Sequence, residues 1–232
     1  MGDTISSFQK GSVVVIGSNL PHVFRSEINP NTTSIMMTLF FDVSSFGTNF
    51  FMLPEFKTLE PFFTAMKNGF KIDDAPKKIA NHFLKLKKVN EFDRFLIFLK
   101  IINSLCQYER KTLSNFIYDK PFSDREGKRM QLVLDYVMTN YSKEITLEKI
   151  ASISNMTKTA FCGYFKIRTN KTFFQYLIDV RIEHACKLLL KNRELSVMEI
   201  AELCGFNNIS NFNRKFKELK QLSPSKYKNL NF

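Results

Sequence analysis

The spacing of apolar positions in the last third of the chain predicts a pair of short helices. In residues 196–227, apolar side chains recur at helical spacing after a serine of the type that caps helix N-termini: Val197, Ile200, Ala201 and Leu203 follow Ser196. Gly205 then breaks the pattern, since glycine readily adopts the positive φ of a sharp turn. The next helix has an apolar face and a polar, basic face. This arrangement predicts a helix-turn-helix motif whose second helix lies in a DNA major groove.

The same pattern occurs a second time, earlier in the chain, at residues 146–165. The positions before the turn correspond pairwise: Thr146, Leu147, Ile150 and Ala151 match Ser196, Val197, Ile200 and Ala201. Asn155 replaces Gly205 at the turn, and beyond it Phe161, Phe165 and Asn170 match Phe212, Phe216 and Gln221. The chain therefore contains two predicted helix-turn-helix motifs.

Residues 172–190, between the two motifs, read as one long helix. At 1.5 Å per residue such a helix spans about 28 Å. Successive major-groove segments on one face of B-DNA lie about 34 Å apart. A connection of this length can hold two recognition helices near that separation, which favours DNA as the partner.

These residues resemble the C-terminal domain of the AraC/XylS family of bacterial transcription regulators. The resemblance covers residues 131–227 and rests on YLIDVRIEHACKLLL, IAELCGF and SNFNRKFKELKQLSPSKY. Asn170 and Gln221 stand where the family often has glycine, and Gly163 where it often has a basic residue. Glycine inside a helix costs about 1 kcal/mol, and a missing arginine–guanine contact about 1–3 kcal/mol. We therefore expect the second motif to read sequence more strongly than the first.

The outward faces of the two recognition helices supply the candidate DNA contacts. In the first motif Thr157 is the expected N-cap, Phe161, Tyr164 and Phe165 face inward, and the candidates are Thr157, Lys158, Thr159, Cys162 and Lys166. In the second, Asn208 or Ser210 begins the helix, Phe212, Phe216 and Leu219 are core, and the candidates are Asn208, Ser210, Asn211, Asn213, Arg214 and Lys217. Arg214 suits a guanine edge and Asn211 an adenine edge or a phosphate. The lysines suit phosphates or are solvated surface residues.

The first fifty residues are expected to form strands, at residues 13–16 and 34–41. The stretch GSVVVIGSNLPHVFRS resembles the closing strands of the cupin-like sensor domain of many such regulators. A complete sensor needs more strands before them, so we expect an incomplete, truncated cupin-like region, and an effector stays an open question. His22 is expected to line a turn or pocket, because the three histidines are scattered and a catalytic metal usually needs three clustered ligands.

Residues 54–71, 74–87 and 90–107 read as helices. The last has a wide apolar face that needs cover on more than one side, either from the core of its own domain or from a helix-on-helix dimer seam, as the family resemblance implies. Residues 108–126 read as a polar linker. Residues 129–141 then open the C-terminal domain, with a buried stripe of Met130, Val133, Leu134, Val137 and Met138.

The charge distribution agrees with this organisation without deciding it. The net charge is +12; residues 124–232 hold 19 Lys and Arg against 11 Asp and Glu, and residues 1–123 hold 15 against 11. The larger excess falls on the predicted DNA-binding part, although a lysine-rich surface explains it equally well. The four cysteines lack disulfide or zinc-finger spacing, which favours reduced thiols and a cytoplasmic location, with Cys186 and Cys204 in the core. We expect no signal peptide and no membrane span.

We thus predict a mainly α fold: two helix-turn-helix units joined by a long helix, preceded by a helical hairpin and a small incomplete cupin-like β region. The predicted parts are a β region at 1–53, a helical dimerisation and linker region at 54–122, and a DNA-binding domain at 123–232. The predicted function is a dimeric, sequence-specific transcription regulator on double-stranded DNA, with RNA polymerase a further candidate partner. The alternative is a truncated regulator-like protein that acts through protein partners and binds DNA weakly. No nucleotide loop, catalytic triad or metal cluster appears, so we predict no cofactor and no enzymatic activity.

Overall fold

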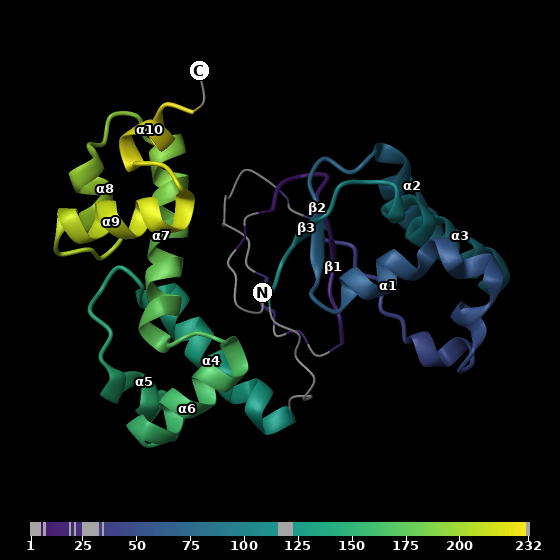
Figure 1. Cartoon of the computed structure of the whole chain (residues 1–232), viewed down its shortest axis with the longest axis horizontal. Coiled ribbons are helices and arrows are strands. Elements are labelled where there is room, and N and C mark those ends of the chain that lie inside the picture. Colours follow the sequence, from purple (N-terminus) through teal and green to yellow (C-terminus); the bar gives the residue numbers. More distant parts are fainter. Residues whose placement is uncertain are drawn as a thin grey trace. The chain divides into compact units, whose positions relative to one another are not determined.

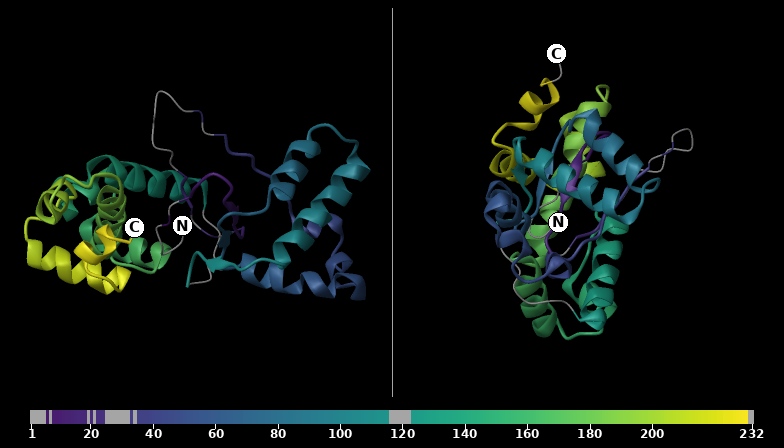
Figure 2. Two further views of the ribbon diagram at one scale, coloured as in Figure 1. Left: turned by 90° about the horizontal axis from the view of Figure 1, so that it is seen from above. Right: turned by 90° about the vertical axis from the view of Figure 1, so that its right-hand side faces the viewer.

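The computed structural model describes residues 6, 8–18, 20, 22–24, 33, 35–115 and 123–230. They form two compact units, an N-terminal unit within Ser7–Asp119 and a C-terminal unit within Lys120–Phe232, to which Met1–Ser6 is also assigned. Helices dominate both units, and Figures 1 and 2 show the few strands confined to the N-terminal one. The prediction of a mainly α fold is confirmed.

The N-terminal unit contains a small antiparallel sheet with strand order β1-β2-β3. Its strands are β1 (Val13–Val15), β2 (Phe70–Ile72) and β3 (Lys111–Thr112). Val14 pairs with Lys71, and Phe70 pairs with Thr112 on the other side. The sheet therefore joins three segments that are distant in sequence, and β1 lies in one sheet with residues from beyond the predicted boundary at residue 53.

Helices and aromatic rings complete this unit. The 3-10 helices are η1 (Val43–Phe46), η2 (Phe50–Met52) and η3 (Pro54–Leu59), and the α-helices are α1 (Glu60–Met66), α2 (Lys77–Leu86) and α3 (Glu91–Cys106). The Phe46 and Phe98 rings stack with centroids 5.5 Å apart. Further rings pack around them, namely Phe41, Phe50, Phe51, Phe56, Phe63 and Phe95. Much of the phenylalanine in the sequence fills this core.

Several boundaries predicted for this unit are wrong. Of the strand predicted at 34–41, the described residues 35–41 have no regular secondary structure, and Phe40 is 88% exposed. The helix predicted at 54–71 is a 3-10 helix followed by α1, and β2 then occupies its predicted end. Gly69, with φ of 65°, separates α1 from β2 and explains the change. The predicted linker at 108–126 contains β3 and the start of α4, while residues 116–122 lie outside the described residues.

The C-terminal unit consists of seven helices in its described part: α4 (Asp124–Asn140), α5 (Leu147–Ile153), α6 (Lys158–Thr169), α7 (Phe173–Lys191), α8 (Val197–Leu203), α9 (Ile209–Lys220) and α10 (Pro224–Lys228). The helix α7 belongs to two hydrophobic cores. Phe173, Leu177 and Val180 join a core with α4, α5 and α6. Ile182, Ala185 and Leu189 join a second core with α8 and α9. Figure 1 shows α7 running the length of the unit, with one motif at each end.

The two motifs repeat each other in detail. Thr146 and Ser196 cap α5 and α8 by accepting a hydrogen bond from the third residue on. The turns use positive φ at both matched positions, 51° at Asn155 and 83° at Gly205. Matched core positions are at most 2% exposed: Ile150, Ala151, Phe161 and Phe165 in the first motif, and Ile200, Ala201, Phe212 and Phe216 in the second. Leu203 and Leu219, predicted on apolar faces, are instead 52% and 40% exposed, because each lies at the edge of its helix's buried face.

Candidate nucleic-acid interface

The helix α6 presents a polar face in the first motif. Thr157 is its N-cap, as predicted, and accepts a hydrogen bond from the Ala160 amide. Phe161 and Phe165 point into the core and Tyr164 is half-buried, so the opposite face is exposed. The predicted candidates Lys158, Thr159, Cys162 and Lys166 are exposed, as are Ala160, Gly163 and Ile167. Lys158 donates to Glu148 of α5 at 2.6 Å, so this lysine has an internal partner in the free protein.

The helix α9 presents the corresponding face in the second motif. Asn208, rather than Ser210, is its N-cap and accepts a hydrogen bond from the Asn211 amide at 2.9 Å. The Arg214 side chain is 65% exposed. Its Nη2 donates to Asn211 Oδ1 at 2.9 Å, and its Nη1 lies 3.8 Å from the Glu218 carboxylate. These neighbours, all on α9, hold the guanidinium outside the core.

The remaining candidates of α9, namely Ser210, Asn213 and Lys217, are also exposed. Figure 1 shows α9 beside the upper half of α7 and α6 at its lower end. The structure thus places the predicted residues at exposed positions of two helices, one at each end of α7. Their contacts with DNA stay a prediction.

The first recognition helix is tied to the start of α4. Arg168 of α6 donates to the Glu126 carboxylate at 2.5 Å, and the Tyr164 hydroxyl donates to the Glu126 carbonyl at 2.9 Å. Glu126 also accepts hydrogen bonds from Ser123 in a capping box. Arg168 first, and then Ser123, lower the pKa of the Glu126 carboxyl from 4.5 to about 2. These contacts fix the roll of α6 about its own axis.

The second motif is held by contacts of a similar kind. Lys220 at the end of α9 pairs with Glu183 of α7. Lys228 of α10 donates to the carbonyls of Arg193 and Leu195, at 2.7 and 2.6 Å, in the segment before α8. The Tyr227 ring packs edge-on against Phe216, with centroids 5.3 Å apart. The C-terminal half of α9 is therefore anchored to α7 and α10, while its outer face stays open to solvent.

Sequence reasoning missed the role of Glu126 and Arg168, because residues up to 126 were assigned to a linker. A signal was present, since Ser123 followed three residues later by Glu126 is a capping-box pattern. The pairing with Arg168 carries no such local signal, because the partners are 42 residues apart.

The other predicted features give no second site. The Nδ1 atom of His22 lies 2.9 Å from the Leu20 carbonyl, as suits a turn residue. Within the described residues, no group of three or more His, Cys, Asp and Glu is arranged to hold a metal ion. Cys186 and Cys204 are buried in the core, as predicted, and burial raises the pKa of their thiols to about 11 and 12. Among the described helices, none combines the length and the apolar character needed to cross a membrane.

Comparison with known proteins assigns the C-terminal motifs to a class. A family model described as "Helix-turn-helix domain" matches residues 150–229. This part of the chain is similar to a helix-turn-helix domain. The predicted domain type is confirmed, and the proteins similar to it are named as transcriptional regulators.

One relative is the uncharacterized HTH-type transcriptional regulator YdeC of Bacillus subtilis, 37% identical over 106 residues. This match covers 46% of the present chain but 36% of YdeC, so the chain spans about a third of that relative. The probable transcriptional regulator LumQ of Photobacterium leiognathi is 24% identical over 98% of this chain and 86% of its own length. The crystal structure of the C-terminal domain of the response regulator yesN from Fusobacterium nucleatum is 29% identical, with a TM-score of 0.41, over 44% of this chain and 98% of that domain.

Replacing Glu126 with glutamine tests the tie between α4 and α6. Glutamine keeps the capping-box acceptor but removes the charge that pairs with Arg168. The folded pKa of this carboxyl lies below its ordinary value, so its stabilisation is present above pH 4.5 and is lost as the pH falls toward 2. Glu126→Gln should lower the free energy of unfolding by about 1 kcal/mol at pH 7 and by little near pH 2.

Chemical denaturation at a series of pH values measures this difference. Glu144→Gln, at an exposed position before α5, is the matched control and should leave stability unchanged. An equal effect of Glu126→Gln at pH 7 and pH 2 would show that the ion pair contributes nothing.

Proposed function

We propose that this protein is a sequence-specific transcription regulator of the AraC type that reads two adjacent major-groove segments of one duplex. The observation that carries the proposal is that the candidate residues of α6 and α9 are exposed on two helix-turn-helix units joined by one long helix, α7. Arg214 and Asn211 read base edges, and Lys158, Lys166 and Lys217 bind phosphates. Asn208, Ser210, Asn213, Thr157, Thr159 and Cys162 line the two faces and contact the backbone or bases nearby.

The two motifs do not contribute equally in this proposal. Gly163 stands at the centre of the outer face of α6, and nothing lies within 4 Å of where its side chain would be. That position supplies no donor to a base or phosphate. Arg214 on α9 is an exposed cation already held by two neighbours on its own helix. The second motif therefore carries most of the sequence discrimination, and the first mainly positions the protein.

A second candidate function follows from the same glycine. If α6 contributes little to affinity, the protein binds DNA weakly and acts through protein partners, RNA polymerase among them. The two candidates differ in salt dependence and in selectivity. Selection of bound duplexes from a random pool by the full chain should enrich one motif, with affinity falling steeply as salt rises. Absence of enrichment would favour the partner-binding function.

We also propose that the protein acts in the cytoplasm as a homodimer, with α3 at the seam. The inner face of α3 packs in the core through Phe98, Ile101 and Ile102. Phe92 and Leu96, one turn apart near its start, are 69% and 37% exposed. The two alternatives for this helix, core and seam, thus describe two faces of it. The cupin-like character of the first residues and any effector stay proposals, supported by the resemblance alone.

Substitution of Arg214 by alanine tests the base-reading assignment. The variant should bind the selected site about 1–3 kcal/mol more weakly and lose its preference at one base position. Lys217→Ala, on the same helix, is the control for a phosphate contact. It should weaken binding to all sequences alike and reduce the salt slope by about 1. An Arg214→Ala protein that binds the selected site as well as the parent would contradict the assignment.

The double substitution Phe92→Ser and Leu96→Ser tests the dimer seam. Because an exposed apolar pair on one helix face favours association, its removal should convert a dimer to a monomer in sedimentation velocity. Met52→Ser, which removes a 78% exposed side chain outside α3, should leave the dimer intact. A parent protein that sediments as a monomer, or a double variant that stays dimeric, would exclude this seam.

A further inference from the structure

Along α7, the change from packing in the core of the first motif to packing in the core of the second occurs at a single residue. Val180 packs in the core of the first motif, Ile182 packs in that of the second, and Arg181 lies between them. If the motifs were joined only through their packing on α7, the angle between them would depend on the conformation of this one helix. Contacts around Arg181 add a second connection, which we call the junction: Tyr141, Ser142, Lys143, Arg181, His184, Gly205 and Phe206.

Arg181 reaches from α7 to the segment that follows α4. Its Nε donates to the Tyr141 carbonyl at 2.7 Å and its Nη2 to the Lys143 carbonyl at 2.8 Å. The same guanidinium lies 5.9 Å from the centre of the Phe206 ring, in the turn of the second motif. A planar guanidinium with several fixed donors can make these contacts together, whereas a lysine ammonium cannot reproduce their geometry. Arg181 therefore links the segment after α4, whose Tyr141 packs against the core of the first motif, to the turn of the second motif.

The backbone of the second turn closes against the same segment. A Cβ atom at Gly205 would lie 2.8 Å from the Ser142 carbonyl oxygen and 2.9 Å from that of Tyr141. Asn155, the matched residue in the first turn, is exposed and has a side chain at similar φ. Glycine at 205 is thus required by close approach as well as by conformation. The Tyr141 ring also stacks on His184 of α7, with centroids 3.9 Å apart.

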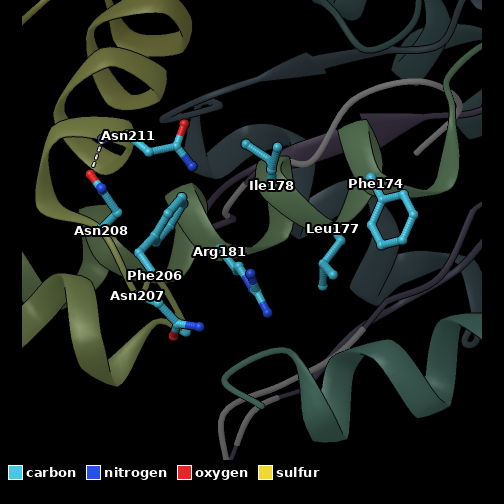
Figure 3. A pocket seen from close by; sticks show the side chains of 9 residues that line it. Phe174, Leu177, Ile178, Arg181, Phe206, Asn207, Asn208 and Asn211 are labelled. Atoms are coloured by element: carbon cyan, nitrogen blue, oxygen red, sulfur yellow. Dashed lines mark hydrogen bonds between the residues drawn. The ribbon is translucent and has the colours of Figure 1, made fainter. Parts of the chain in front are cut away.

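A hollow beside the junction shows why these contacts matter. A cavity of about 280 Å³ separates Phe174, Leu177 and Ile178 of α7 from Asn208 and Asn211 at the start of α9. Figure 3 shows these residues around the space, with Arg181 beside Phe206. Side chains do not fill the angle between α7 and α9 on that side. The shared core and the Lys220–Glu183 pair hold α9 on α7. The hydrogen bonds of Arg181 and the close approach of Gly205 hold α7 and the second turn against the segment after α4.

We propose that Arg181 is a positioning residue that locks the second helix-turn-helix motif to the first, so that α6 and α9 meet DNA at one fixed spacing. The spacing claim rests on the proposed function, whereas the lock itself is a property of the free protein. Loss of the lock leaves both motifs folded, because each has its own core. It changes their mutual orientation and therefore which half-site separations the protein accepts.

The lock is tested without DNA by a distance measurement between the two recognition helices. Spin labels are placed on exposed Cys162 of α6 and on Asn213→Cys of α9, in a Cys106→Ser background, since Cys186 and Cys204 are buried. Double electron–electron resonance on the full chain should give one narrow distance distribution. Arg181→Met keeps the apolar stem but loses the donors, and should broaden or split the distribution. Arg181→Lys should give an intermediate width.

Two controls separate the lock from general destabilisation. Arg125→Met, at an exposed position on α4, should keep the narrow distribution. Gly205→Asn is a second test of the lock. Asparagine also tolerates positive φ, but its side chain would clash with Ser142, so this variant should broaden the distance distribution as Arg181→Met does. The second control, Asn155→Gly at the matched position of the first turn, should leave the distance distribution narrow. Unchanged width in a folded Arg181→Met protein would overturn the proposal.

The functional consequence is measured on the selected duplex and on duplexes with three base pairs inserted between its halves. Rigid coupling of two sites can raise affinity by about 100-fold or more, and this gain is lost when geometry forbids both contacts. The parent should therefore discriminate between the two duplexes, and Arg181→Met should reduce that ratio by about tenfold. Equal ratios in parent and variant would overturn the spacing claim. The parent could fail to select any DNA site while its narrow spin-label distance distribution is still broadened by Arg181→Met. That combination would refute the proposed function and leave the lock standing.

Discussion

The arrangement of the C-terminal unit depends on one helix that serves two hydrophobic cores. The first half of α7 packs with α4, α5 and α6, and the second half with α8 and α9. Because protein cores are close-packed, a helix shared in this way carries the orientation of one core to the other. Arg181 at the crossover adds hydrogen bonds from the shared helix to the segment after α4. The two recognition helices are therefore parts of one body, which is what simultaneous binding to two groove segments requires.

The recognition helices themselves follow a simple division of labour. Paired phenylalanines, Phe161 with Phe165 and Phe212 with Phe216, bury one face of each helix completely. Side-chain caps at Thr157 and Asn208 each satisfy one free amide of the first turn. Ionic anchors at the inner edges, Arg168 to Glu126 and Lys220 to Glu183, involve no outward-facing residue. The exposed faces are left available for a ligand, and their polar and basic character suits a nucleic acid.

Sequence reasoning succeeded where the relevant interactions are local. The caps at Thr157 and Ser196, the turn at Gly205 and the buried phenylalanines follow from residue type and helical spacing, and the structure places them as predicted. The contacts of Arg181 could not be predicted, since their partners lie 38 and 40 residues away and are backbone carbonyls, which any residue type supplies. The strand predicted at 34–41 failed for a related reason. An apolar run forms a strand only where a neighbouring strand pairs with it, and β2 pairs with β1 and β3 instead.

Hydroxyl-radical footprinting of the full chain on its selected duplex tests the central claim most directly, because it reports each contacted groove segment separately. A rigid pair of recognition helices should protect two segments per chain, on one face of the duplex and about one helical turn apart. Protection of a single segment per chain, or of two segments on opposite faces, would contradict the account.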